Sequence, residues 1–304
     1  MTLIDKKFIS NARVNYVAQL LGMGLGFISV TLLVKFGGLE LYGMMAVMLA
    51  LGATVTNLIS FRTNEALVRF YKRGASKSNH ELQYFSVSAG LCLDIVTGLA
   101  LLTIIQIFAE AIGLYLLKST TQQDAISLFS LMASANFLRG TGYGLLTAQE
   151  QFNAISVLGV LEQGIKVVCI GLGIWSLEDL QLHNIMLLIF ISSIPFTFYY
   201  IFIAVKQLFT RPLRRWTRKK WVRLYWSFSL NTFISSTLKS GYKNMDAVIL
   251  GYFSSPAMVG LYNLFKQFIS PLNMLSAPYS SQIYPKFVDA LSKKSLNLDR
   301  KSVV

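Results

Sequence analysis

The stretch VNYVAQLLGMGLGFISVTLLVK, residues 14–35, is a predominantly apolar run whose only charged side chain is its final lysine. A bilayer core about 30 Å thick is crossed by about 20 helical residues, because each residue of an α-helix rises about 1.5 Å. Similar runs recur along the 304-residue chain, which is 54% hydrophobic and 14% charged. A typical soluble domain is about 25% charged. The sequence therefore predicts an all-α, multi-pass membrane protein.

Eight apolar runs are long enough to cross a membrane as helices. They cover residues 14–35, 41–61, 84–108, 125–147, 153–175, 183–205, 224–253 and 257–283. We divide the chain accordingly into a complete six-helix lobe, a basic cytoplasmic linker, and a second lobe that holds only its first helix pair and a tail. These three parts are residues 1–206, 207–223 and 224–304.

The 28 Lys and Arg residues are distributed unevenly between the connections. Five lie in the interior of the predicted spans, Lys35 is the last residue of the first span, and Lys118 lies in another connection. All the rest lie in residues 6–13, 62–77, 206–223 and 286–301. These four segments fall on one side of the membrane when eight spans alternate, and an excess of Lys and Arg marks the cytoplasmic side. We therefore predict a cytoplasmic N-terminus.

The linker region contains TRPLRRWTRKKWVR, residues 210–223, which in isolation is typical of a nucleic-acid-binding patch. Its position between two spans indicates a different partner. Each cation near a membrane surface gains about 1 kcal/mol from anionic lipid, and Trp216 and Trp221 fall where indole rings anchor at the headgroups. We predict that this stretch contacts anionic membrane lipid, binds no nucleic acid, and can act as a hinge between the lobes.

Five cations lie inside the predicted spans, where a charge that faced lipid would cost about 2.5–3.5 kcal/mol. They are Arg139, Lys166, Lys239, Lys243 and Lys266. In the seventh span, Lys239 and Lys243 share a helical stripe with Asn231 and Asp246. Asp246 can pair with Lys243, whereas Lys239 has no acid one turn away. Lys239 is therefore the better candidate to meet an anionic ligand.

Polar stripes also follow the eighth and first spans. The stripe of the eighth span includes Lys266 and Gln267, and Pro271 and Pro278 interrupt that helix, as helices that line cavities tolerate. The first span carries a stripe that includes Asn15, with glycines that favour close helix packing.

The acids within the spans can be paired with cations. Asp94 is the acid of the third span and Arg139 the cation of the fourth, so the two can pair across helices. Glu162 and Lys166 are four residues apart in the fifth span and can neutralise each other. Any of Asp94, Glu162 and Asp246 that is left unpaired is a candidate for binding a coupling ion.

Motifs of soluble enzymes are absent from the sequence: it has no CxxC, HExxH, P-loop or nucleophile elbow. His80 lies in a connection and His183 at the very start of a span, and no connection is long enough to hold a catalytic domain. We expect a protein that is not an enzyme and uses no cofactor or metal.

Three segments resemble a known family. Residues 15–51, NYVAQLLGMGLGFISVTLLVKFGGLELYGMMAVMLAL, resemble the opening helix pair of polysaccharide flippases, with GGLELYG at 37–43 the most typical part. Residues 61–71, FRTNEALVRFY, resemble the end of their second helix, and residues 245–287 resemble their seventh and eighth helices. These flippases are O-antigen type transporters of the multidrug/oligosaccharidyl-lipid/polysaccharide exporter superfamily, which is MATE-like.

The resemblance implies two helical lobes that rock around a central cavity lined by helices one, two, seven and eight. It implies that the cavity moves an undecaprenyl-pyrophosphate-linked oligosaccharide, an O-antigen or capsule repeat unit, to the periplasmic leaflet of the plasma (inner) membrane. Polysaccharide assembly proteins would be further partners. Family members have about twelve helices or more, so we expect a C-terminally truncated member. The substrate-binding residues expected are Lys239, Lys243, Lys266, Arg13, Asn15 and Asn231.

Other functions stay open. A cation-coupled drug exporter of the same fold would use cavity carboxylates such as Asp94, Glu162 and Asp246. The cations of spans seven and eight outnumber their acids, which favours an anionic substrate. A membrane-embedded polysaccharide polymerase or glycosyltransferase would need a sizeable loop with acids or Arg, and the connection at 109–124 is short and nearly neutral. A purely structural membrane subunit would not need cations within its spans.

Overall fold

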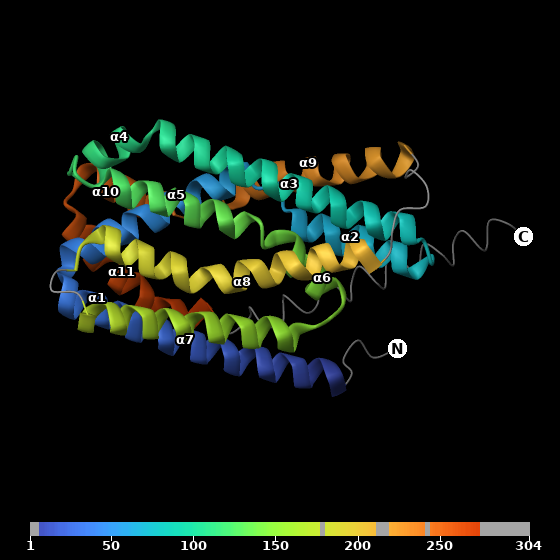
Figure 1. The fold of residues 1–304 in the computed structure, drawn as a ribbon, viewed down its shortest axis with the longest axis horizontal. Coiled ribbons are helices and arrows are strands. Elements are labelled where there is room, and N and C mark those ends of the chain that lie inside the picture. The colour runs from blue at the N-terminus through green and yellow to red at the C-terminus, as the bar shows by residue number, and fades with distance from the viewer. Residues whose placement is uncertain (1–5, 177–179, 211–218, 241–243, 274–304) are drawn as a thin grey trace, which may run out of the picture.

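The computed structural model describes residues 6–176, 180–210, 219–240 and 244–273, which form an elongated bundle of helices without a β-strand among them (Figure 1). The elements are α1 (Lys6–Ile59), α2 (Thr63–Ser76), α3 (His80–Ile107), α4 (Ala109–Ala111), the π-helix η1 (Ile112–Leu116), α5 (Gln123–Phe137), α6 (Gly140–Ala148), α7 (Phe152–Ser176), α8 (Leu182–Thr210), α9 (Lys219–Ser240), α10 (Met245–Phe253) and α11 (Pro256–Asn273).

Four stretches among the described residues are long and apolar enough to cross a membrane: Arg13–Ile59 of α1, and the helices α3, α7 and α8. Their mean hydropathy lies between 1.8 and 2.1. Large apolar side chains such as Val17, Leu99 and Phe198 are exposed on the outside of the bundle, where lipid would cover them. The protein is thus an all-α, multi-pass membrane protein, as the sequence predicts.

The connections alternate between the two ends of the bundle (Figure 1). At one end, Lys118 Nζ, which follows η1, donates to the carbonyl oxygen of Tyr252 at the end of α10, at 2.9 Å. At the other end, Lys72 near the end of α2 pairs with Glu150, in the turn before α7, at 2.7 Å. The chain therefore crosses the bundle back and forth along its long axis.

The first two predicted spans form one kinked helix, α1. The kink lies at Gly38, whose φ of 81° and ψ of 168° are non-helical. A positive φ is open to glycine because it lacks a Cβ atom. A few residues later, a Cβ atom on Gly43 would lie 1.7 Å from the carbonyl oxygen of Pro256. The GGLELYG stretch therefore lets the chain bend and brings α1 against the backbone of α11.

The helix of the second predicted span ends at Ile59, close to the expected residue 61. After a break that includes Arg62, which has a left-handed φ of 51°, a further helix, α2, begins at Thr63. α2 packs along the first half of α3 and buries one side, including Leu67 and Phe70. α2 contains too many polar and charged residues to form an apolar run in the sequence, although its inner face is mostly apolar.

Three of the cations in residues 62–77 lie on α2. The side chain of Lys72 is buried and bound to Glu150. The guanidinium groups of Arg69 and Arg73 lie over the rings of Phe228 and Trp221 on α9, 4.4 and 4.9 Å from the ring centroids. Cation–π contacts of this kind hold α9 against the first lobe.

Two other spans are built from pairs of shorter helices. The fourth span consists of α5 and α6, with a break at Leu138 and Arg139. The seventh consists of α9 and α10. The eighth begins as α11, and its expected remainder, from residue 274, lies outside the described residues. Where a helix breaks within a membrane, other groups must bind the backbone N–H and C=O groups that lose their partners. We therefore expect polar side chains at the breaks.

Candidate functional site

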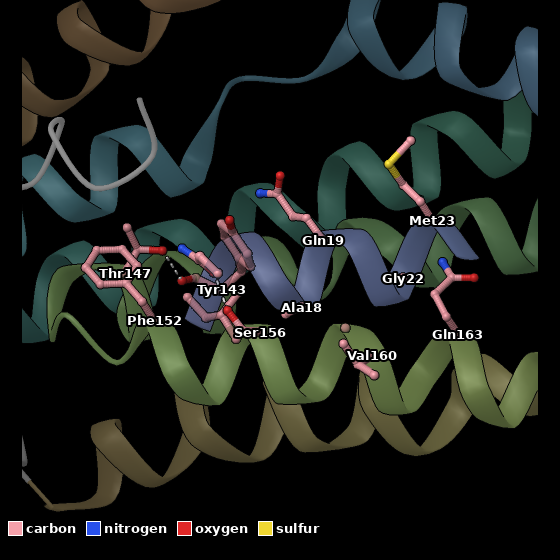
Figure 2. Close-up of a pocket in the computed structure, with 13 residues that line it drawn as sticks. Ala18, Gln19, Gly22, Met23, Tyr143, Thr147, Phe152, Ser156, Val160 and Gln163 are labelled. Carbon is pink, nitrogen blue, oxygen red and sulfur yellow. Dashed lines mark hydrogen bonds between the residues drawn. The ribbon is translucent and has the colours of Figure 1, made fainter. Parts of the chain in front are cut away.

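A pocket of about 420 Å³ lies between α1, α6 and α7 (Figure 2). This volume is within the range of about 300–1,000 Å³ that is common for small-molecule sites. Its walls are Asn15, Ala18, Gln19, Gly22 and Met23 of α1, Tyr143 and Thr147 of α6, and Phe152, Ile155, Ser156, Gly159, Val160 and Gln163 of α7.

The pocket follows from the residue spacing on its two long walls. On α1 and on α7 the lining residues recur every three or four positions, so each set occupies one helical face. Gly22 and Gly159 leave space between the helices: a Cβ atom added at either would meet no heavy atom within 4 Å. Glycine at these positions therefore hollows an interface that larger side chains would fill.

The polar groups of the pocket are only partly used by the protein. Ser156 Oγ donates a hydrogen bond to Asn15 Oδ1, which links α7 to α1. Thr147 Oγ1 donates to the carbonyl oxygen of Tyr143 at 2.9 Å. Gln163 Oε1 is buried and has no hydrogen-bond partner among the described residues. None of the lining residues that the structure describes carries a charge.

Asp94, near the middle of α3, is 1% exposed and binds the first turns of α2 and α6. Thr63 Oγ1 donates to Asp94 Oδ1 at 2.5 Å. The backbone N–H and the Oγ1 of Thr141 donate to Asp94 Oδ2 at 2.7 and 2.6 Å. An ionised carboxylate accepts such bonds, and the N-termini of the two helices add a positive partial charge. Asp94 thus binds the starts of the two helices that follow the breaks in the second and fourth spans.

Arg139, immediately before α6, connects that helix to α7 and α8. Its Nη1 lies 2.7 Å from Glu162 Oε1, and the two side chains are 14% and 26% exposed. Its Nε donates to Thr197 Oγ1 at 2.8 Å, and its Nη2 donates to the carbonyl oxygen of Ser193 at 2.8 Å. The planar guanidinium group can serve several acceptors at once because its donors point in fixed directions.

Two pairings expected from the sequence are therefore wrong. Asp94 binds Thr63 and Thr141 rather than Arg139. Glu162 binds Arg139 rather than Lys166, and no carboxylate of the described residues lies within ion-pair distance of Lys166. The helix break explains both results, because it presents the N-terminus of α6 to Asp94 and turns Arg139 toward α7.

A family model described as "Polysaccharide biosynthesis protein" matches residues 8–291. The chain belongs to this family. The match covers nearly all of the helices α1 to α11, and it agrees with the resemblance to polysaccharide flippases. No curated protein sequence matches the chain.

Solved transporter structures share the fold of this polysaccharide biosynthesis protein. The MATE multidrug transporter DinF-BH, solved as a complex, is 10% identical with a TM-score of 0.68, and the match covers 94% of this chain and 65% of that one. A MOP superfamily transporter from Pyrococcus furiosus is 14% identical with a TM-score of 0.63, covering 93% and 64%. An inward-facing MATE family transporter is 12% identical with a TM-score of 0.62, covering 89% and 66%. The chain thus spans less than two thirds of the length of these relatives.

The residues expected to bind substrate do not all meet in the pocket. Asn15 lines it. Arg13 is exposed on α1 but is not among the lining residues, and Asn231 is exposed on α9. Lys239 belongs to the last turn of α9, and Lys243 lies outside the described residues.

Lys266 and Asp246 form an ion pair between α11 and α10. Lys266 Nζ lies 2.8 Å from Asp246 Oδ2, with side chains that are 43% and 38% exposed, and Tyr262 OH also donates to this carboxylate. Lys266 is thus paired with a residue of the preceding helix. The roles assigned to Lys266 and Asp246 in binding substrate and ion remain predictions.

Sequence reasoning missed several residues of the pocket, notably Tyr143, Thr147 and Gln163. A signal was present, because Ser156, Gly159 and Gln163 form a stripe of small and polar residues along the fifth span. The sequence-based prediction relied mainly on charged residues, whereas the described lining of the pocket is uncharged.

Proposed function

We propose that this membrane protein moves an undecaprenyl-pyrophosphate-linked oligosaccharide, an O-antigen or capsule repeat unit, from the cytoplasmic to the periplasmic leaflet of the inner membrane. In this proposal the N-terminus is cytoplasmic, and residues 1–206 form a lobe that works with helices of a second lobe by alternating access. The observation that carries it is the uncharged polar pocket between α1, α6 and α7, because amide and hydroxyl groups are suited to the many hydroxyl groups of a sugar.

The anionic end of such a lipid needs a cation, and Lys166 is the described residue best placed to supply one. It lies three residues after Gln163, about one helical turn beyond the residues of α7 that line the pocket. Its neighbour Glu162 is already bound to Arg139. We propose that the pyrophosphate meets Lys166, with Lys239 and Lys243 as further candidates, while anionic lipid contacts the basic linker. Polysaccharide assembly proteins stay the proposed protein partners.

A drug exporter that binds cations is the second candidate, since two of the similar structures are described as multidrug transporters. A cationic drug requires a carboxylate with spare capacity. Glu162 and Asp246 are bound to Arg139 and Lys266, and Asp94 accepts three hydrogen bonds. This distribution of charge favours the oligosaccharide over a cationic drug.

Complementation tests the proposal in cells that lack their own flippase but hold the matching sugar genes. The wild-type chain should restore surface polysaccharide. Gly159→Leu should not, because its side chain fills a pocket in which a Cβ atom meets nothing within 4 Å. Gly164→Leu is the matched control, because this glycine of α7 also has open space around it but does not line the pocket.

Membrane levels of each variant are measured in parallel. The proposal fails if the wild-type chain does not restore polysaccharide at normal membrane levels. The assignment of the pocket fails if Gly159→Leu and Gly164→Leu restore it equally well.

A further inference from the structure

We infer that the pocket between α1, α6 and α7 binds an uncharged sugar ring, and that Gln163 is a residue that determines this specificity. The inference rests on the proposed function and narrows its substrate class. It predicts a neutral hexose or an N-acetylhexosamine in the pocket, rather than a uronic acid.

The described residues that line the pocket are uncharged. The charged side chains closest in sequence on α7 are Glu162, which is bound to Arg139, and Lys166, which is not a lining residue. A uronic acid in the pocket would lose water around its carboxylate without gaining a cation from the walls, and burying an unpaired charge is unfavourable. A neutral ring avoids this loss.

Some hydrogen-bonding groups of the lining residues are not used by the protein. Gln163 Oε1 is buried without a partner among the described residues. Asn15 uses its Oδ1 to accept from Ser156, which leaves its amide N–H groups to donate to a ligand. A side-chain amide offers both donors and acceptors, and a sugar hydroxyl group both donates and accepts. A hydroxylated ligand can therefore satisfy these groups once the side chain of Gln163 rotates its buried oxygen toward the pocket.

Aromatic rings also line the pocket. Tyr143 and Phe152 lie together toward one end of the pocket, and Gln163 lies toward the other (Figure 2). The faces of aromatic rings carry negative charge density, and the C–H groups of a sugar ring pack against them. The pocket thus combines an aromatic surface for the apolar face of a ring with amides for its hydroxyl groups.

The test is saturation-transfer NMR on the full chain in lipid nanodiscs, with methyl glucoside, N-acetylglucosamine and glucuronate as probes. At least one of the two neutral sugars should bind, and glucuronate should bind more weakly. Gln163→Met, which keeps the shape of the side chain, should weaken neutral-sugar binding about tenfold, as expected when a buried hydrogen bond is lost. Asn153→Leu, which removes an exposed amide of α7 outside the pocket, should change binding by less than about twofold.

A second variant keeps the test independent of any loss of folding. Gln163→Lys places a cation in the pocket and should give a gain of glucuronate binding. The inference is overturned if glucuronate binds the wild-type chain as tightly as the neutral sugars, if no probe binds, or if Gln163→Met binds like the wild type. It is also overturned if Gln163→Lys is folded but gains no glucuronate binding.

These outcomes are separate from those of the complementation experiment. If the chain binds neutral sugars through Gln163 but does not restore polysaccharide, the transport function fails and the sugar site stands. If the chain restores polysaccharide and Gln163→Met changes neither binding nor polysaccharide, the transport function stands and the specificity assignment fails.

Discussion

The breaks in the second and fourth spans and the pocket beside them are both polar, but their polar groups are used differently. At the breaks, Asp94 accepts bonds from Thr63 and Thr141, and Arg139 binds a carboxylate, a hydroxyl and a carbonyl group. In the pocket, the buried Oε1 of Gln163 has no partner in the described part of the chain. Buried polar groups that bind one another hold helices together, whereas unused ones in a cavity are available to a ligand. The comparison therefore distinguishes residues that hold the helices together from those that we propose bind a ligand.

The largest effect on stability is expected at Asp94. Asp94→Ala removes the acceptor of three hydrogen bonds and leaves the first turns of α2 and α6 without their common partner. We expect the folded protein to lose about 4 kcal/mol or more, because bonds to a charged group are among the strongest in proteins. Thermal unfolding of the purified protein in detergent measures this loss.

Asp124→Ala is the matched control for this change, because Asp124 is an exposed acid in the first turn of α5. Its melting temperature should stay close to that of the wild type. Equal melting temperatures for the two variants would show that Asp94 does not hold the breaks together.

The next effect is expected at the pair of Arg139 and Glu162. Glu162→Leu leaves Arg139 without its carboxylate, and we expect a loss of about 2–3 kcal/mol in unfolding free energy. This is below the cost of about 3–5 kcal/mol for breaking a fully buried pair, because both side chains keep some exposure. The double variant Glu162→Leu/Arg139→Met should recover part of the loss, since it removes the unpaired charge. A double variant that is less stable than Glu162→Leu would argue against a paired charge at this position.

The smallest effect is expected in the pocket. Gln163→Met should leave the unfolding free energy unchanged or raise it by up to about 1 kcal/mol, because it removes a buried acceptor that has no partner. The same variant should lose neutral-sugar binding, so stability and binding should change independently. A marked loss of stability would place Gln163 among the structural residues and remove the contrast between the two regions.

The sequence predicts much of the fold because lipid requires long apolar helices. The spans at residues 84–108, 153–175 and 183–205 correspond to α3, α7 and α8 within a few residues. The apolar runs did not reveal that a further helix, α2, begins after Arg62. The inner face of α2 is apolar, but its average is lowered by cations that bind Glu150 or stack on aromatic rings.

The candidate site was harder to predict because it depends on contacts between distant segments. Asn15 and Ser156, which bond across the pocket, are 141 residues apart in the chain. The spacing of Glu162 and Lys166 along one helix suggested a local pair, but the helix break brought Arg139 to Glu162 instead. Spacing within one helix can identify a face, and it cannot identify which other helix will meet that face.

The central claim is that the chain moves a lipid-linked sugar through the pocket between α1, α6 and α7. The most direct measurement reconstitutes the purified chain in liposomes with a fluorescent polyprenyl-diphosphate-linked neutral sugar, and follows quenching of the inner-leaflet pool by an impermeant reductant. We predict rapid quenching of that pool with the wild-type chain and with Gly164→Leu. The pool should be protected from quenching with Gly159→Leu and in empty liposomes. Protection with the wild-type chain, or equal quenching with both glycine variants, would contradict it.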